Sequence, residues 1–363
     1  MVAAKGDGNN GDGKMAKPKI LVTGATGKTG APSARMLIEK GYPVRALVHR
    51  ADGRSEALKR AGAEIVVGSL EDPLDVREVM RGVGRAYFCP PLEPGALRRA
   101  AIFADAAQEA KLEALVVLSQ WLVDRTHLSI HAREKYLAGR IFAWASGPGV
   151  VTINPGWFAD NYMAALEPIA QFGLMALPLG EGLNAPPSNE DIARVIVGAL
   201  TDPAPYVGKT FRPTGPKLLS PQEIAATFGK VLGRKVRYQN APIALFLKFA
   251  RSIGLSDFIM VQLYYFLLDY QRGSFGVGAP TGTVLEIGGA EPEAFEAIVR
   301  RYVAQSPSAR RSLGGTAKAA WNLARAMLTA APDPDALAEK LGIPKIPHGN
   351  LAADSLTWQS AHA

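Results

Sequence analysis

The chain has 363 residues, of which 48% are hydrophobic and 20% are charged. These values are typical of a soluble globular protein built as one large domain or two coupled ones. The single cysteine, Cys89, excludes an internal disulfide framework and favours a reducing compartment, so we expect a cytoplasmic protein. The net charge of +8 is spread along the chain, and no basic run carries interleaved aromatic residues. We therefore expect an anionic small-molecule ligand and no nucleic acid.

Two stretches of the sequence raise the questions of disorder and of a membrane span. Residues 1–17 are rich in Gly, Asn and Asp and have no apolar core of secretory length, which predicts a disordered lead-in. Residues 241–270 form the most apolar later stretch. Four residues interrupt it before the ~20 apolar residues that a spanning helix needs, namely Lys248, Arg251, Gly254 and Asp257. This stretch predicts buried helices and no membrane span.

From residue 19 onward, short apolar runs alternate with helical patterns. The first run, KILVT, ends at a glycine, and the segment APSARMLIEK after it has apolar residues at helical spacing. The later predicted strands are 43–50, 63–68, 85–90 and 113–120, and the predicted helices between them are 55–62, 74–82 and 96–111. This alternation predicts parallel strands joined by right-handed crossovers. The strands lack polar alternation, which indicates an α/β fold with a doubly wound sheet covered on both faces.

The regular alternation fades after the segment GVVTINPGWFADNYM, which begins at residue 149. We predict four parts in the chain. They are a lead-in over 1–17, a doubly wound domain over 18–155, a smaller, largely helical lobe on the substrate side over 156–304, and a helical extension over 305–363. We also expect that some segments of the lobe return to the sheet.

The stretch VTGATGKTG places three glycines, Gly24, Gly27 and Gly30, between the first predicted strand and the first predicted helix. Such a loop brings unpaired backbone N–H groups and the positive end of a helix to one point, where a pyrophosphate is favoured. A tight turn made for packing alone would also use glycines. Because the loop opens an alternating series of strands and helices, we interpret it as a dinucleotide site.

The end of the second predicted strand bears on the adenosine ribose. An acidic residue there binds a 2′-hydroxyl, whereas an arginine pairs with a 2′-phosphate. This strand ends in LVHR, with Arg50 at the deciding place, and the glycine loop adds Lys28. The sequence therefore favours NADP(H) over NAD(H), the alternative being that Arg50 is an ordinary solvated charge.

At this point the sequence resembles the NmrA-like group of atypical short-chain dehydrogenases/reductases. The glycine loop and VRALVHR resemble its first landmarks, and HAREK, NPGWFADN, EDIARVIVGAL and GKTFRPTGPKLLSPQEIA follow in the family's order. The resemblance covers roughly residues 19–302. It implies a Rossmann-type, NADP-binding domain with a smaller C-terminal lobe and a cleft between them.

Carried over by position, the resemblance implies a set of cofactor-binding residues. Gly24, Thr26, Gly27, Lys28, Thr29 and Gly30 would surround the phosphates, and Arg50 the 2′-phosphate. Ser69 and Leu70 would flank the adenine, although the family usually has an aspartate where Ser69 stands. Phe88, Cys89 and Pro90 would lie along the cofactor, and Pro155, Gly156, Trp157 and Phe158 near the nicotinamide.

The catalytic residues are less well marked. Ordinary short-chain dehydrogenases place a tyrosine four residues before a lysine, and the nearest pattern here, YLAGR, begins one residue after Lys135. Lys135 matches the lysine of the family's His-x-x-x-Lys pattern, as a ribose contact or proton donor, with His131 one helical turn earlier. Ser119 at the end of the fifth strand is a candidate to polarise a carbonyl. Each of the three has a plain alternative, as a surface lysine, a solvated histidine or a strand cap, and Cys89 is expected to serve packing.

The function predicted from these residues is hydride transfer from NADPH to a quinone, enone or carbonyl compound. Four aromatic residues are candidates for the lining of an apolar pocket, with core packing as the alternative: Trp121, Trp157, Phe158 and Tyr162. The expected partner is an apolar small-molecule acceptor, in a monomer or homodimer. No metal site is expected, because the five histidines do not stand at ligand spacing. Two other functions stay open, a non-catalytic NADP(H) sensor and an isomerase that uses the cofactor transiently.

Overall fold

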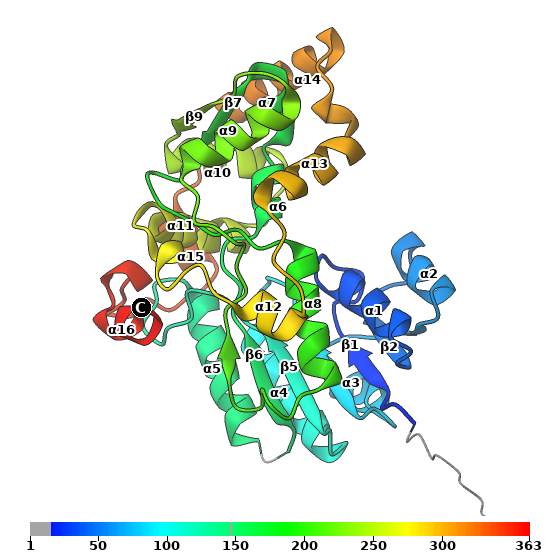
Figure 1. The fold of residues 1–363 in the computed structure, drawn as a ribbon. Helices are drawn as coiled ribbons and strands as arrows, with labels where there is room; N and C mark the ends of the chain where they lie inside the picture. Colours follow the sequence, from blue (N-terminus) through cyan, green and yellow to red (C-terminus); the bar gives the residue numbers. More distant parts are fainter. Residues whose placement is uncertain (1–15, 146) are drawn as a thin grey trace, which may run out of the picture.

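The computed structural model describes residues 16–145 and 147–363, so the predicted lead-in lies almost wholly outside the described residues. Within them, seven strands form a parallel sheet in the order β3-β2-β1-β4-β5-β6-β8 (Figure 1). The strands are β1 (Ile20–Val22), β2 (Val44–Val48), β3 (Glu64–Val67), β4 (Arg85–Phe88), β5 (Ala114–Leu118), β6 (Gly149–Ile153) and β8 (Thr210–Phe211). The predicted α/β fold with a doubly wound parallel sheet is confirmed.

Helices cover both faces of this sheet, as the unbroken apolar strands predicted. One face packs against α1 (Gly30–Glu39), α8 (Asn189–Thr201) and α12 (Thr283–Gly288). The other packs against α3 (Pro73–Val79), α4 (Ala96–Glu109) and α5 (Ile130–Trp144). A short helix, α2 (Gly53–Arg60), follows β2. The two hydrophobic cores therefore lie above and below one sheet.

The strand order reverses at β1, which pairs with β2 on one side and with β4 on the other. In open α/β sheets, ligands bind at such a switch point, outside the carboxyl ends of the strands. Thr23, Cys89, Ser119 and Asn154 follow β1, β4, β5 and β6 directly. The fold therefore brings two predicted site residues, Cys89 and Ser119, to one edge of the sheet.

A largely helical region stands beyond that edge (Figure 1). It holds a parallel pair of strands, β7 (Leu174–Leu177) and β9 (Arg237–Asn240). Its helices are α6 (Ala159–Met163), α7 (Leu166–Phe172), α9 (Pro221–Leu232), α10 (Ile243–Ser252), α11 (Asp257–Gln271) and α13 (Phe295–Gln305), with short 3₁₀ turns at Ser274–Gly276 and Pro307–Ala309. Although β8, α8 and α12 come after residue 155, they lie on the large sheet. The four-part division of the chain stays a prediction.

The last residues form α14 (Leu313–Leu328), α15 (Pro334–Lys340), the 3₁₀ turn Ala352–Asp354 and α16 (Leu356–His362). Contacts tie α14 to α7 and α10, and α15 to α11. The apolar stretch at 241–270 folds into α10 and α11, with a break between them. Over the ranges 16–145 and 147–363, no helix combines the length and the apolar character needed to cross a membrane.

Candidate active site

The glycine loop forms a narrow turn between β1 and α1. The N–H of Gly27 donates to the carbonyl oxygen of Gly24 at 2.8 Å, and Gly24 has a φ of +58°. A Cβ on Gly30 would lie 2.2 Å from that same carbonyl oxygen. Gly30 is therefore required for the close approach of helix and loop, and Gly24 suits the left-handed backbone.

The amino end of α1 is open to an anion. Thr29 stands at the N-cap but makes no side-chain capping bond, and the first turn holds no acidic residue. The Thr29 hydroxyl instead bonds the buried Tyr87 hydroxyl at 2.9 Å. Ala31 already donates its N–H to the Gly27 carbonyl oxygen at 3.0 Å, and Pro32 has no N–H. The Gly30 N–H and the helix dipole still favour negative charge, so these residues fit a dinucleotide pyrophosphate.

Lys28 in this loop forms an ion pair with Asp160 of α6, whose carboxylate is buried. The second oxygen of that carboxylate has no hydrogen-bond partner among the described residues. The pair joins the glycine loop to the helical region. Sequence reasoning missed Asp160, because nothing in the spacing links it to a loop so far away in the chain.

Arg50 is exposed just beyond the end of β2, and it makes no ion pair within 16–145 and 147–363. Asp52, the carboxylate two residues further along the chain, is already engaged. It accepts from the N–H of Arg54 and of Ser55 as the cap of α2, and the Arg54 guanidinium lowers the pKa of Asp52 to about 2. Arg50 is thus a charge without an ion pair among the described residues, near the strand end where the sequence predicted the 2′-phosphate.

The predicted adenine contacts are arranged locally. The Ser69 N–H donates to Asp75 of α3 at 2.8 Å, and the Ser69 hydroxyl oxygen accepts from the Glu71 N–H at 3.1 Å. Leu70 is half-buried against the core on the α3 face. The Ser69 hydroxyl therefore stabilises its own turn. The family usually has an aspartate at this position, and the serine here makes this local contact.

The residues after β4 divide between core and loop. The Phe88 ring packs against Phe103 and Phe142, with ring centroids 4.5 and 5.4 Å apart. The Cys89 N–H donates to the Thr23 hydroxyl oxygen at 2.8 Å, and the carbonyl of Cys89 lies against Gly24. The backbone after Phe88, rather than its ring, thus borders the glycine loop.

Lys135 and His131 are both buried on α5. The Lys135 ammonium donates to the carbonyl oxygen of Leu118 at 2.8 Å, and burial lowers the pKa of Lys135 to about 8. Burial, with the charge of Lys135 beside it, places the pKa of His131 well below its usual value, so His131 is neutral. The alternative of a surface lysine does not hold. Ser119 follows Leu118 and donates its N–H to the Ile153 carbonyl.

A cavity of about 540 Å³ lies along α5, lined at one end by Ser119 and Lys135 and also by Gly149 and Val207, near the amino ends of β6 and β8. Tyr136, Arg140 and Asn154 also line it, and the Asn154 side-chain oxygen is buried without a partner in the described part of the chain. The glycine loop does not line this cavity, so the dinucleotide interpretation rests on the loop itself. Tyr136 follows Lys135 and so does not fit the tyrosine–lysine spacing of ordinary short-chain dehydrogenases. Its side chain nevertheless lines the same cavity as Lys135.

The loop after β6 turns toward the helical region. The Trp157 ring packs edge-on against Tyr270 and Phe275, with centroids 5.7 and 5.8 Å apart. Pro155 is buried, Gly156 lies beside the Trp121 ring, and Phe158 is half-buried at the start of α6. Of the four aromatic residues considered for an apolar pocket, all pack in the hydrophobic cores and none lines the described cavity.

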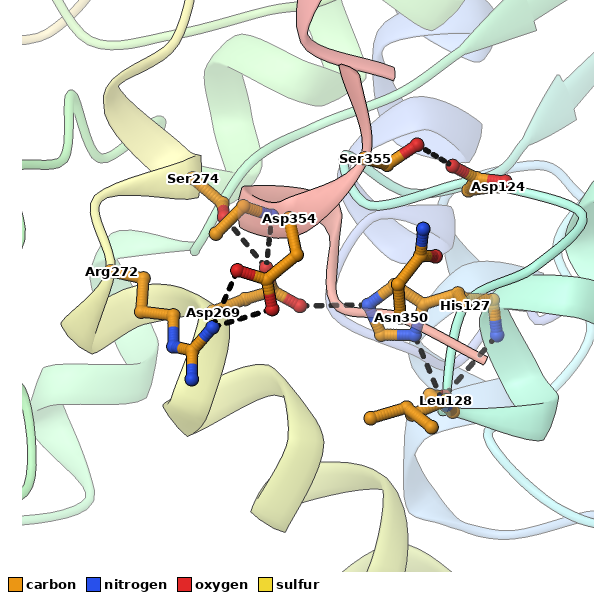
Figure 2. Close-up of polar contacts among 12 residues, drawn as sticks. Asp124, His127, Leu128, Asp269, Arg272, Ser274, Asn350, Asp354 and Ser355 are labelled. Carbon is orange, nitrogen blue, oxygen red and sulfur yellow. Dashed lines mark hydrogen bonds and ion pairs between the residues drawn. The ribbon is translucent and has the colours of Figure 1, made fainter. Parts of the chain in front are cut away.

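A buried polar junction fixes the amino end of α5 (Figure 2). The Ser129 N–H donates to Nδ1 of His127, so Nε2 carries the ring proton and donates to Asp269 at 2.7 Å. Asp269 also accepts from the Ser274 hydroxyl at 2.6 Å and from the Ala353 N–H at 3.0 Å. The junction therefore holds α5, α11 and the C-terminal extension together.

Residues 16–268 match the model of the NmrA-like family. The chain belongs to the NmrA-like family.

Within the described residues of this family member, no three His, Cys, Asp or Glu side chains gather into a metal site.

The chain is 28% identical to an NAD(P)H azoreductase from Xenophilus azovorans over 287 residues, which cover 77% of this chain and 99% of that protein. The fold is similar to an NADPH-dependent quinone oxidoreductase from Escherichia coli complexed with NADPH, with a TM-score of 0.68 at 23% identity over 78% of this chain and 99% of the other. It is also similar to the negative transcriptional regulator NmrA in complex with NADP, with a TM-score of 0.66 at 18% identity over 79% and 95%. The family's NAD(P)-binding Rossmann-type fold is thus shared with reductases and with a regulator.

Proposed function

We propose that this protein is an NADPH-dependent reductase that transfers a hydride to a quinone, an enone or a carbonyl compound. One observation carries the proposal. The uncapped amino end of α1 and the buried Lys135 lie at the same edge of the sheet, and Lys135 borders a cavity large enough for an aromatic acceptor. The reductases among its relatives support the same class of reaction.

The preference for NADPH rests on the charges near the end of β2. Arg50 is exposed and without an ion pair among the described residues, while Asp52 is committed to α2 and Arg54. A guanidinium matches a phosphate in geometry and charge, whereas the ribose hydroxyl of NAD(H) would need a free carboxylate. Lys28 in the glycine loop is paired with Asp160, so the preference rests on Arg50.

The cofactor would supply the hydride, and the protein's residues supply position and a proton. The glycine loop and α1 would hold the pyrophosphate. Below pH about 8, Lys135 carries an ammonium that can release a proton to an acceptor oxygen. Ser119 lines the same cavity and would orient that oxygen. His131 is neutral and buried, so we assign the proton to Lys135 rather than to His131.

A non-catalytic NADP(H) sensor is the second candidate, and the absence of a tyrosine four residues before Lys135 favours it. The buried neutral His131 occupies that position. Quinones need little help from a phenol, because water or Lys135 can protonate the product. The two functions therefore make different predictions for a quinone, and an experiment separates them.

The test follows NADPH absorbance with the full-length protein in excess over the nucleotide, against a panel of quinones, enones and carbonyl compounds. We expect at least one quinone to cause loss of NADPH, and Lys135→Met to slow that loss at least tenfold. The Lys230→Met variant is the control, because Lys230 lies on the surface of α9 and pairs with Glu296. Tight NADPH binding without loss for any acceptor would contradict the proposal and favour the sensor.

A further inference from the structure

Helix α14 presents its larger apolar side chains to solvent and its small ones to the protein. The buried residues of this helix are Ala319 and Ala326. The opposite face carries Leu313, Trp321 and Leu328, which are 94%, 69% and 89% exposed. The spacing of 313, 317, 321, 324 and 328 places these residues on one side of a helix, with exposed alanines between them. This polarity is the reverse of that expected for a surface helix of a globular protein.

Polar contacts, rather than burial of this face, hold α14 in place. Asn322 donates to Glu167 of α7 at 3.0 Å, and Lys318 pairs with the same carboxylate at 3.1 Å. At the other end, Lys248 and Arg251 of α10 donate to the Met327 and Ala330 carbonyl oxygens at 3.1 and 3.3 Å. These cations stabilise the carboxyl end of α14. The helix is thus fixed in one orientation, with its apolar face outward.

The charged residues in the sequence around α14 have one sign. Residues 297–332 contain six Lys and Arg residues and no Asp or Glu. Arg310 and Arg311 precede α14 and are exposed, and Arg325 lies beside Trp321 and Leu328 on the same helix surface. Within the described ranges none of these three arginines has an ion pair, while the nearby Lys318 is paired with Glu167. Their charges are therefore available to an external anion.

The position of α14 suits a flat partner. It lies at the end of the molecule away from the large sheet, shown in orange in Figure 1. It also lies beyond residue 268, where the match to the family ends. The outward face of α14 thus belongs to a part of the chain that the family model does not cover.

We propose that the outward face of α14 docks the protein on the surface of an anionic lipid bilayer. A row of Leu, Ala and Trp flanked by unpaired arginines fits the boundary between lipid head groups and acyl chains. Anionic lipids attract such arginines, and tryptophan favours this interface. A second copy of the chain would also cover an apolar row, but two copies meeting on this face would bring their arginines together. This inference is independent of the proposed reductase activity.

The test is co-sedimentation of the full-length protein with vesicles of phosphatidylcholine, with or without phosphatidylglycerol. We expect binding to the anionic vesicles that weakens with added salt, and much less binding to phosphatidylcholine alone. The Leu313→Ser/Leu328→Ser double variant should bind at least tenfold more weakly. The Arg310→Gln/Arg311→Gln/Arg325→Gln variant should lose the preference for anionic lipid.

The matched control is Leu356→Ser, which removes a leucine that is 81% exposed on α16 instead of on α14. This control should bind vesicles as the unaltered protein does. All variants should have the circular dichroism spectrum of the unaltered protein. Equal binding by the double variant and the control would overturn the proposal. Absence of vesicle binding at low salt would also overturn it, as would a dimer in light scattering that the double variant dissolves without any lipid effect.

Discussion

The glycine loop and the buried polar junction around Asp269 both fix residues at the candidate site, but they are encoded in opposite ways. The loop is built by neighbours in sequence, since the atoms that exclude a side chain at Gly30 belong to Gly24 and Ala25. The junction joins His127 to Asp269, which is 142 positions away, and Asp269 to Ala353, which is 84 further on. A turn formed by sequence neighbours can be predicted from the sequence. A junction between distant segments becomes visible only in the folded structure.

The largest expected effect comes from breaking the junction. Asp269→Ala leaves three donors without their acceptor: the ring N–H of His127 and the Ser274 hydroxyl, which are buried, and the Ala353 N–H, which is part-buried. Each unsatisfied buried donor costs about 1–3 kcal/mol, so we expect the free energy of unfolding to fall by about 3–5 kcal/mol. Urea denaturation of the full chain, followed by circular dichroism, measures the loss. A loss below about 1 kcal/mol would mean that water or a neighbouring group replaces the carboxylate.

A substitution in the glycine loop should lower the affinity for the cofactor more than it lowers the stability of the protein. In Gly30→Ala the new Cβ would overlap the Gly24 carbonyl, so the loop must shift. We expect a cost of about 1–3 kcal/mol in stability and a fall of at least tenfold in NADPH affinity. The matched control is Gly53→Ala at the start of α2, where no atom lies within 4 Å of the added Cβ. Equal NADPH affinity in both variants would argue against a phosphate site in the loop.

The lowered pKa of Lys135 should make both the stability and the activity of the protein depend on pH. Its pKa is about 8 in the folded protein against 10.5 for an ordinary lysine, so the unfolded chain binds more protons between these values. Stability should therefore rise with pH from about 8 to 10.5, and Lys135→Met should abolish that rise. If Lys135 donates the proton, kcat/KM for a carbonyl acceptor should fall about tenfold per pH unit above pH 8. A flat profile would assign the proton to water.

The smallest effect is expected at the rim of the junction. Arg272 and Asp354 form an ion pair, but both side chains are 50% exposed (Figure 2). Exposed pairs of this kind contribute about 0–1 kcal/mol. Asp354→Asn should accordingly cost far less than Asp269→Ala in the same urea experiment. Similar costs for the two substitutions would show that the junction depends on its exposed rim.

The sequence predicted the parts of the molecule that local patterns determine. Periodic apolar runs gave the strands and helices of the large sheet, and the loop at Gly24–Gly30 was located by its place between the first strand and the first helix. The family was also confirmed. The roles of the individual site residues, Lys135 and Arg50 among them, stay predictions.

Contacts between distant segments escaped sequence reasoning. The pair of Lys28 with Asp160 and the burial of His131 depend on how the helical region packs against the sheet. The ring of Trp157 faces Tyr270 because residues more than a hundred positions apart share one core. An aromatic residue near a predicted site is compatible with both pocket and core, and only the packing decides between them.

The most direct measurement is a fluorescence titration of the full-length protein and of Arg50→Asp with NADPH and with NADH. A dinucleotide site with a phosphorylated ribose predicts that the unaltered protein binds NADPH at least tenfold more tightly than NADH. The substitution should remove most of that preference while changing NADH affinity little. Equal loss of both affinities, or no binding of either nucleotide by the unaltered protein, would contradict the assignment of the glycine loop and Arg50 to NADPH.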